Sequence, residues 1–177
     1  MHSPVRHRRW PSLEAFTLAL LIIGAGGRSW AQSAKDSPNH PEGSTIESRD
    51  FSVTGSGFAI AKLENGTKAF SNRDYIWQSV PSSLNAHRYT QSAGGTPPRV
   101  IVHAKQDVVL EVMSAMEQRG VDLASWDRPG TSFTYTDRKG KAGKGTRMML
   151  LHKALQKGQD FELPQGNWSG VLLIFPD

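Results

Sequence analysis

From Asp50 onward, short runs of apolar and β-branched residues alternate with clusters of glycine, proline, asparagine and aspartate. Runs of about four to eight such residues between turn signals are typical of β-strands. The runs are 51–53, 58–61, 68–70, 75–77, 88–90, 99–104, 108–113, 132–136, 147–155, 159–163 and 168–175. We expect about eight or nine strands, which predicts an all-β, sandwich or jelly-roll-like single domain.

Three segments need a more specific interpretation. The runs 99–104 and 108–113 are rich in β-branched residues and only a few residues apart, which predicts a paired hairpin. Residues 148–155 are compatible with a helix on propensity, but the turn at 157–160 and the strand after it favour a β-strand. Between Ser114 and Trp126 a short helical turn and an irregular crossover are equally consistent with the pattern.

The N-terminus has the three parts of a secretory signal peptide. A basic stretch at 6–9 precedes an apolar run at 15–25, and small residues follow at Ser29 and Ala31. The apolar run is shorter than the ~20 residues that a membrane-spanning helix needs, so we expect no retained membrane anchor. We therefore predict a cleaved signal peptide at 1–31 and a secreted or periplasmic product.

The residues after the predicted signal divide into two parts. Residues 32–48 are polar and bury too little apolar surface to offset the entropy of ordering them, so we expect a flexible linker. Residues 49–177 are then the β-sandwich domain. The chain has no cysteine, which excludes disulfides, thiolate metal sites and a cysteine nucleophile.

Removal of the signal also lowers the net charge. The full chain has a formal charge of +5, but four arginines and only one glutamate fall in 1–31, which leaves +2. Nucleic-acid-binding domains concentrate lysine and arginine on one face. We therefore expect no nucleic-acid partner.

The sequence contains no recognisable catalytic or metal motif. Gly55-Ser56-Gly57 lacks the Gly-x-Ser-x-Gly spacing of a nucleophile elbow, and no two histidines have the close spacing of metal ligands. We predict no catalytic residue, no metal and no cofactor. The alternative is a small secreted hydrolase with distant acids, which His87, His103 or His152 within about 3 Å of a carboxylate in a cleft would favour.

Two groups of residues are candidates for ligand contact. The segment 138–147 holds five cations and is either a solvated connection or a contact for an acidic glycan or anionic surface. Trp77 and Trp168 lie in predicted strands and are expected in the core, whereas Trp126 follows a loop pattern and is expected to be exposed. The predicted ligand-binding residues are Trp126, Tyr135, Lys139, Lys141 and Lys144.

The phrase Asn72-Arg73-Asp74-Tyr75-Ile76-Trp77, followed by Val80-Pro81 and Leu84, resembles a non-catalytic β-sandwich module of bacterial secreted proteins. That module is often appended to polysaccharide-degrading enzymes. The likeness extends over about 68–175 and includes Val108 to Val112, Leu123 to Trp126 and Pro164 to Asn167. It implies that Trp77, Val80 and Leu84 are core anchors and that Arg73 and Asp74 fix a local turn.

Together these features predict an exported, non-catalytic binding or accessory domain. Carbohydrate is the leading class of ligand, and another extracellular surface, such as the cell envelope, is the second. The alternatives are the small hydrolase and an envelope scaffold protein with no small ligand.

Overall fold

The computed structural model describes residues 45–115, 121–137, 145–166, 168 and 170–176. They all belong to one compact unit, 33–177. Its strands are β1 (Ile46–Glu47), β2 (Phe51–Ser56), β3 (Phe58–Lys62), β4 (Tyr75–Gln78), β5 (Arg88–Ser92), β6 (Arg99–Ala104), β7 (Val108–Ala115), β8 (Ser132–Asp137), β9 (Thr146–Leu155), β10 (Asp160–Glu162) and β11 (Leu172–Phe175). A single 3-10 turn, η1 (Ser82–Leu84), is the only helical element in these ranges, and they hold no helix that could span a membrane.

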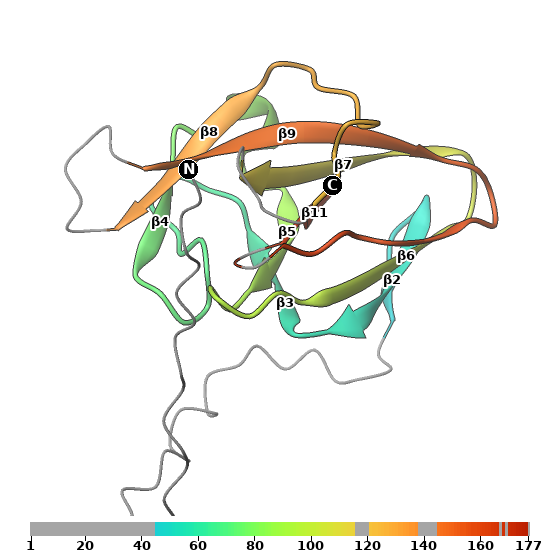
Figure 1. The fold of residues 1–177 in the computed structure, drawn as a ribbon, viewed down its shortest axis with the longest axis horizontal. Helices are drawn as coiled ribbons and strands as arrows, with labels where there is room; N and C mark the ends of the chain where they lie inside the picture. The colour runs from blue at the N-terminus through green and yellow to red at the C-terminus, as the bar shows by residue number, and fades with distance from the viewer. Residues whose placement is uncertain (1–44, 116–120, 138–144, 167, 169, 177) are drawn as a thin grey trace, which may run out of the picture. The chain divides into compact units, whose positions relative to one another are not determined.

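The strands form two antiparallel sheets, which confirms the predicted all-β sandwich (Figure 1). The four-stranded sheet has the order β1-β2-β6-β10, and the seven-stranded sheet has the order β3-β5-β11-β7-β9-β8-β4. β1 lies within the predicted linker, so the sheet begins before the predicted boundary at residue 49.

The predicted hairpin of 99–104 with 108–113 is wrong. β6 pairs with β2 and β10, whereas β7 pairs with β11 and β9, so the short turn between them crosses from one sheet to the other. Residues 146–155 do form a strand, β9, as the turn after them suggested. That turn, where Gly158 has φ +79°, is a second crossing, because β10 belongs to the four-stranded sheet.

A first core fills the space between the two sheets. Inward-facing residues of β2 and β6, such as Phe51 and Val102, pack against residues of β7, β9 and β11, such as Val112, Leu151 and Leu173. Alternation along β2 and β6 leaves their other side chains on the outer face of the four-stranded sheet.

A second core lies on the opposite face of the seven-stranded sheet. Trp77 on β4, at one end of the strand order, contacts Tyr89 on β5, near the other end, with ring centroids 5.6 Å apart. The sheet therefore curls around this core until strands from its two ends meet. Trp77, Val80 and Leu84 are buried here, which confirms them as core anchors.

Candidate functional site

An open hollow of about 410 Å³ lies beside the turn that joins β1 to β2. Its walls come from that turn, from the start of β5 and from the chain after β11, and its lining residues are Glu47, Ser48, Arg49, Asp50, Arg88 and Pro176. Four of these six side chains are ionisable at neutral pH. The volume lies within the range of about 300–1,000 Å³ that is usual for small-molecule sites, although the lining is more polar than in most of them.

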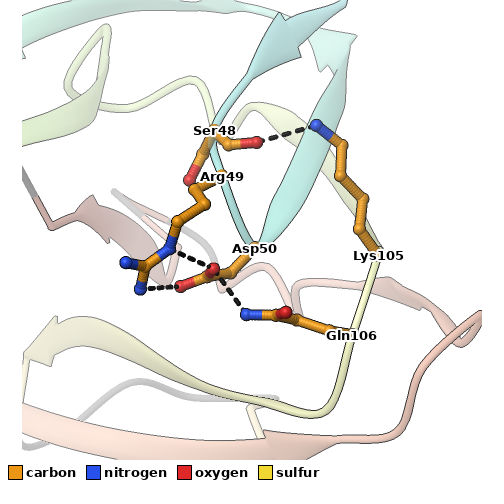
Figure 2. A network of polar contacts seen from close by, with 5 residues as sticks. All are labelled: Ser48, Arg49, Asp50, Lys105 and Gln106. Carbon is orange, nitrogen blue, oxygen red and sulfur yellow. Dashed lines mark hydrogen bonds and ion pairs between the residues drawn. The ribbon is translucent and has the colours of Figure 1, made fainter.

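Asp50 is the centre of a polar network at this hollow (Figure 2). Arg49 donates two hydrogen bonds to its carboxylate, from Nε to Oδ1 at 2.6 Å and from Nη2 to Oδ2 at 2.9 Å. Gln106 Nε2 donates a third to Oδ1 at 2.6 Å. The hydrogen bond from Arg49 lowers the pKa of Asp50, because it favours the ionised form.

The turn between β6 and β7 fixes the position of this network. The backbone N–H of Lys105 donates to the Asp50 carbonyl at 2.9 Å. The Nζ atom of the Lys105 side chain donates a hydrogen bond to the Ser48 carbonyl at 2.7 Å and forms an ion pair with the Glu47 carboxylate at 2.5 Å. The crossing that the sequence pattern did not predict therefore brings Lys105 and Gln106 to the site.

The two arginines of the hollow differ in their surroundings. The Arg49 side chain is 88% exposed although it holds Asp50, whose own side chain is only 14% exposed. Arg88 lies with its guanidinium carbon 5.7 Å from the ring centroid of Phe175. Each guanidinium is thus placed by a neighbour, and a guanidinium has several N–H donors. The arrangement suits a polar ligand with several oxygen atoms.

A second open hollow, of about 550 Å³, lies where β7 begins and β9 ends. Its lining is mainly apolar and consists of Asp107, Val108, Val109, Ala154, Leu155, Gln156 and Gln159. Val109 is 58% exposed. This hollow has one ionisable group, against four in the first, and so offers fewer groups to orient a polar ligand.

The prediction that Trp126 is exposed is wrong. Its side chain is 6% exposed, because it packs into the first core and against Phe161, with ring centroids 5.8 Å apart. Lys153 Nζ lies 5.7 Å from its ring centroid. A buried indole cannot stack on a sugar ring. The loop pattern around Trp126 was therefore not a correct indication that its side chain is exposed.

Tyr135 is buried as well, with 6% of its surface exposed. It stacks on Tyr75 at 5.7 Å and meets Phe70 edge-on at 5.0 Å. Burial raises the pKa of its hydroxyl. Its ring faces serve the second core, and Lys139, Lys141 and Lys144 lie outside the described residues.

Trp168 and the Arg73-Asp74 pair have partners that the sequence did not indicate. Trp168 is half-buried against the second core, and the Arg73 guanidinium lies 5.6 Å from its ring centroid. Asp74 forms an ion pair with Lys68 at 3.6 Å. Arg73 therefore holds Trp168 in place, and Asp74 acts separately from it.

Two histidines lie near carboxylates. His103 Nδ1 is 2.7 Å from Asp160 Oδ1 on the outer face of the four-stranded sheet. His152 lies 3.6 Å from both Glu111 and Asp127. Among the described residues, no group of three or more histidine, aspartate or glutamate side chains is arranged to hold a metal ion.

Comparisons with known proteins give no family. No family model, no curated protein and no solved structure matches this chain.

Sequence reasoning missed the residues of the first hollow. Arg49 and Asp50 stand at the predicted edge of the domain, and Gln106 and Arg88 are distant from them in sequence. The one available signal is the adjacent arginine and aspartate just before the first strong strand, which is too common a dipeptide to single out.

Proposed function

We propose that this protein is an exported binding domain for carbohydrate, and that the first hollow holds the sugar. The observation that carries the proposal is the Arg49–Asp50–Gln106 network at an open hollow with further polar groups from Glu47, Ser48 and Arg88. Planar carboxylate, amide and guanidinium groups hydrogen-bond the adjacent hydroxyls of a sugar at several points. The resemblance to modules appended to polysaccharide-degrading enzymes and the signal-like N-terminus support the same function and an extracellular or periplasmic location.

The buried aromatic residues change how such binding would work. Trp126 and Tyr135 are not available as stacking platforms, so affinity has to come from hydrogen bonds to polar side chains. Such bonds give modest net free energy, about 0.5–1.5 kcal/mol each, because the groups exchange water for ligand. We therefore propose weak binding to a single sugar, and retention on a polysaccharide through repeated rebinding to neighbouring copies of that sugar.

The proposal is tested by retention of the full chain on a panel of neutral and acidic polysaccharides. We expect retention on at least one of them and at least a tenfold weaker affinity for Arg49→Ala, which removes a donor from the rim. Arg99→Ala is the matched control, because Arg99 is also an exposed arginine that hydrogen-bonds a carboxylate, that of Glu162 at 3.2 Å. The control should bind like the unmodified chain.

Two results would contradict the proposal. One is the absence of retention on every polysaccharide of the panel. The other is equal weakening by Arg49→Ala and Arg99→Ala, which would indicate a general charge effect. A triple variant with Lys139, Lys141 and Lys144 changed to alanine, in the same assay, tests whether the cationic segment adds a second contact.

A further inference from the structure

The outer face of the four-stranded sheet places a serine, a histidine and an aspartate side by side. Ser52 on β2 is directly opposite His103 on β6, and His103 is directly opposite Asp160 on β10. The neighbours Val53, Val102 and Phe161 belong to the first core, so the three polar side chains all project from the other face. Three adjacent strands thus bring together residues that are far apart in sequence.

His103 and Asp160 form a close pair, and the strand register places Ser52 on the other side of His103. His103 Nδ1 is 2.7 Å from Asp160 Oδ1, which is hydrogen-bond distance. β2 and β10 flank β6 on opposite sides, so Ser52 and Asp160 lie on opposite sides of His103. Directly opposed residues in an antiparallel pair have Cβ atoms about 4.5–5.5 Å apart, within reach of a histidine side chain.

We propose that Ser52 is a nucleophile activated by His103. The row formed by Ser52, His103 and Asp160 would then cleave acyl esters. This site is separate from the hollow and does not depend on sugar binding there. Asp160 is the positioning residue: it accepts the Nδ1 proton of His103, which leaves Nε2 as the acceptor, and it stabilises the imidazolium that forms.

The reaction consumes one ester and one water. Ser52 Oγ forms a bond to the acyl carbon as its proton passes to His103 Nε2, and the bond to the alcohol oxygen breaks as the alcohol takes that proton. Water then gives a proton to His103 and attacks the acyl-serine. The carboxylic acid is released, and Ser52 regains its proton from His103.

The openness of the face defines the class of substrate. The His103 and Asp160 side chains are 52% and 74% exposed, so the row has no walls to enclose a small molecule. An ester that projects from a larger molecule, such as an acyl substituent on a polymer, reaches the row without needing a pocket. Because developing charge on the carbonyl oxygen faces water, we expect slow turnover, and acylation of Ser52 is the step to measure.

The test is covalent labelling of the full chain with a fluorophosphonate reagent, located by peptide mass mapping. We expect the label on Ser52 and at least a tenfold slower reaction in Ser52→Ala and His103→Gln. Thr54→Ala is the matched control, since Thr54 lies on the same strand and face, opposite Ile101. It should react like the unmodified chain, and circular dichroism checks that every variant is folded.

The test of Asp160 has to distinguish a role in orienting His103 from a role in stabilising the fold. We expect Asp160→Ala to slow labelling at least tenfold and Asp160→Glu to restore most of the rate, because a carboxylate again reaches Nδ1. Absence of label on Ser52 would overturn the proposal. So would labelling of Ser52 at an unchanged rate in folded His103→Gln.

Discussion

At the scale of single residues, the buried hydroxyl of Tyr89 has hydrogen-bond partners from three parts of the chain. It accepts hydrogen bonds from Trp77 Nε1 and Gln91 Nε2, both at 3.1 Å, and donates to the Lys68 carbonyl at 3.0 Å. Trp77 is fully buried, so its indole N–H depends on this partner. One phenol therefore ties β5, β4 and the segment between β3 and β4 together.

Burial raises the pKa of Tyr89, and this predicts a loss of stability in alkali. The unfolded tyrosine ionises near its ordinary pKa of 10, whereas the folded one does not. Its contribution is therefore complete below pH 10 and is lost as the pH rises toward the folded pKa. At pH 11 we expect a loss of roughly 1 kcal/mol from this residue, measured by denaturant unfolding.

Tyr89→Phe is the control for that prediction. At pH 8 it should cost about 1–3 kcal/mol, because the buried N–H of Trp77 loses its acceptor. Its stability should then fall less steeply between pH 9 and 11 than that of the unmodified chain. Equal slopes for the two proteins would contradict the assignment to Tyr89.

At the scale of elements, strand β2 carries a glycine that its partner requires. Gly55 has φ +136°, and a Cβ at this position would lie 1.9 Å from the carbonyl oxygen of Arg99 on β6. Gly55 is opposite Val100 in the register of these strands. A side chain would therefore push the two strands apart in the middle of the four-stranded sheet.

We expect Gly55→Ala to lower the free energy of unfolding by at least about 3 kcal/mol. Gly66→Ala is the matched control, because Gly66 also has a positive φ, +83°, but no atom lies within 4 Å of an added Cβ. It should cost only the backbone strain, about 1–2 kcal/mol. Urea unfolding of both variants measures the difference, and equal costs would show that the close approach of β6 is unimportant.

At the scale of the whole described domain, strand β11 contributes side chains to both cores, as β7 and β9 also do. Leu173 and Phe175 of β11 belong to the first core, whereas Leu172 and Ile174 belong to the second. β11 also lies between β5 and β7 in the seven-stranded sheet. Neither core can be completed without this strand, so the two cores should form and melt together.

We therefore predict a single cooperative unfolding transition, with coincident curves from far-ultraviolet circular dichroism and tryptophan fluorescence. Leu173→Ala should lower stability by about 2–5 kcal/mol and shift both curves equally, because the fluorescence reports on Trp126 in the first core and on Trp77 in the second. Val109→Ala, at an exposed position, should change stability by less than about 0.5 kcal/mol. Two separate transitions would contradict the coupling.

Local pattern determined the strands but not their partners. The pattern of apolar runs identified most strands and predicted burial of Trp77, because side-chain periodicity depends only on neighbouring residues. It placed β1 in the linker and predicted a strand at 68–70 that the structure lacks. Burial of Val80 and Leu84 was implied by the resemblance. The same pattern wrongly paired β6 with β7, since short separation favours a hairpin and says nothing about a crossing between sheets.

The candidate sites were decided by tertiary structure for the same reason. The segment around Trp126 has the composition of a loop, yet packing against Phe161, which is distant in sequence, buries the Trp126 side chain. Ser52, His103 and Asp160 come together only through strand register, and Gln106 reaches Asp50 only because β6 and β7 lie in different sheets. The sequence by itself determined most of the strands, because their patterns are local, whereas packing and pairing across large sequence separations decided that Trp126 is buried and which polar groups meet.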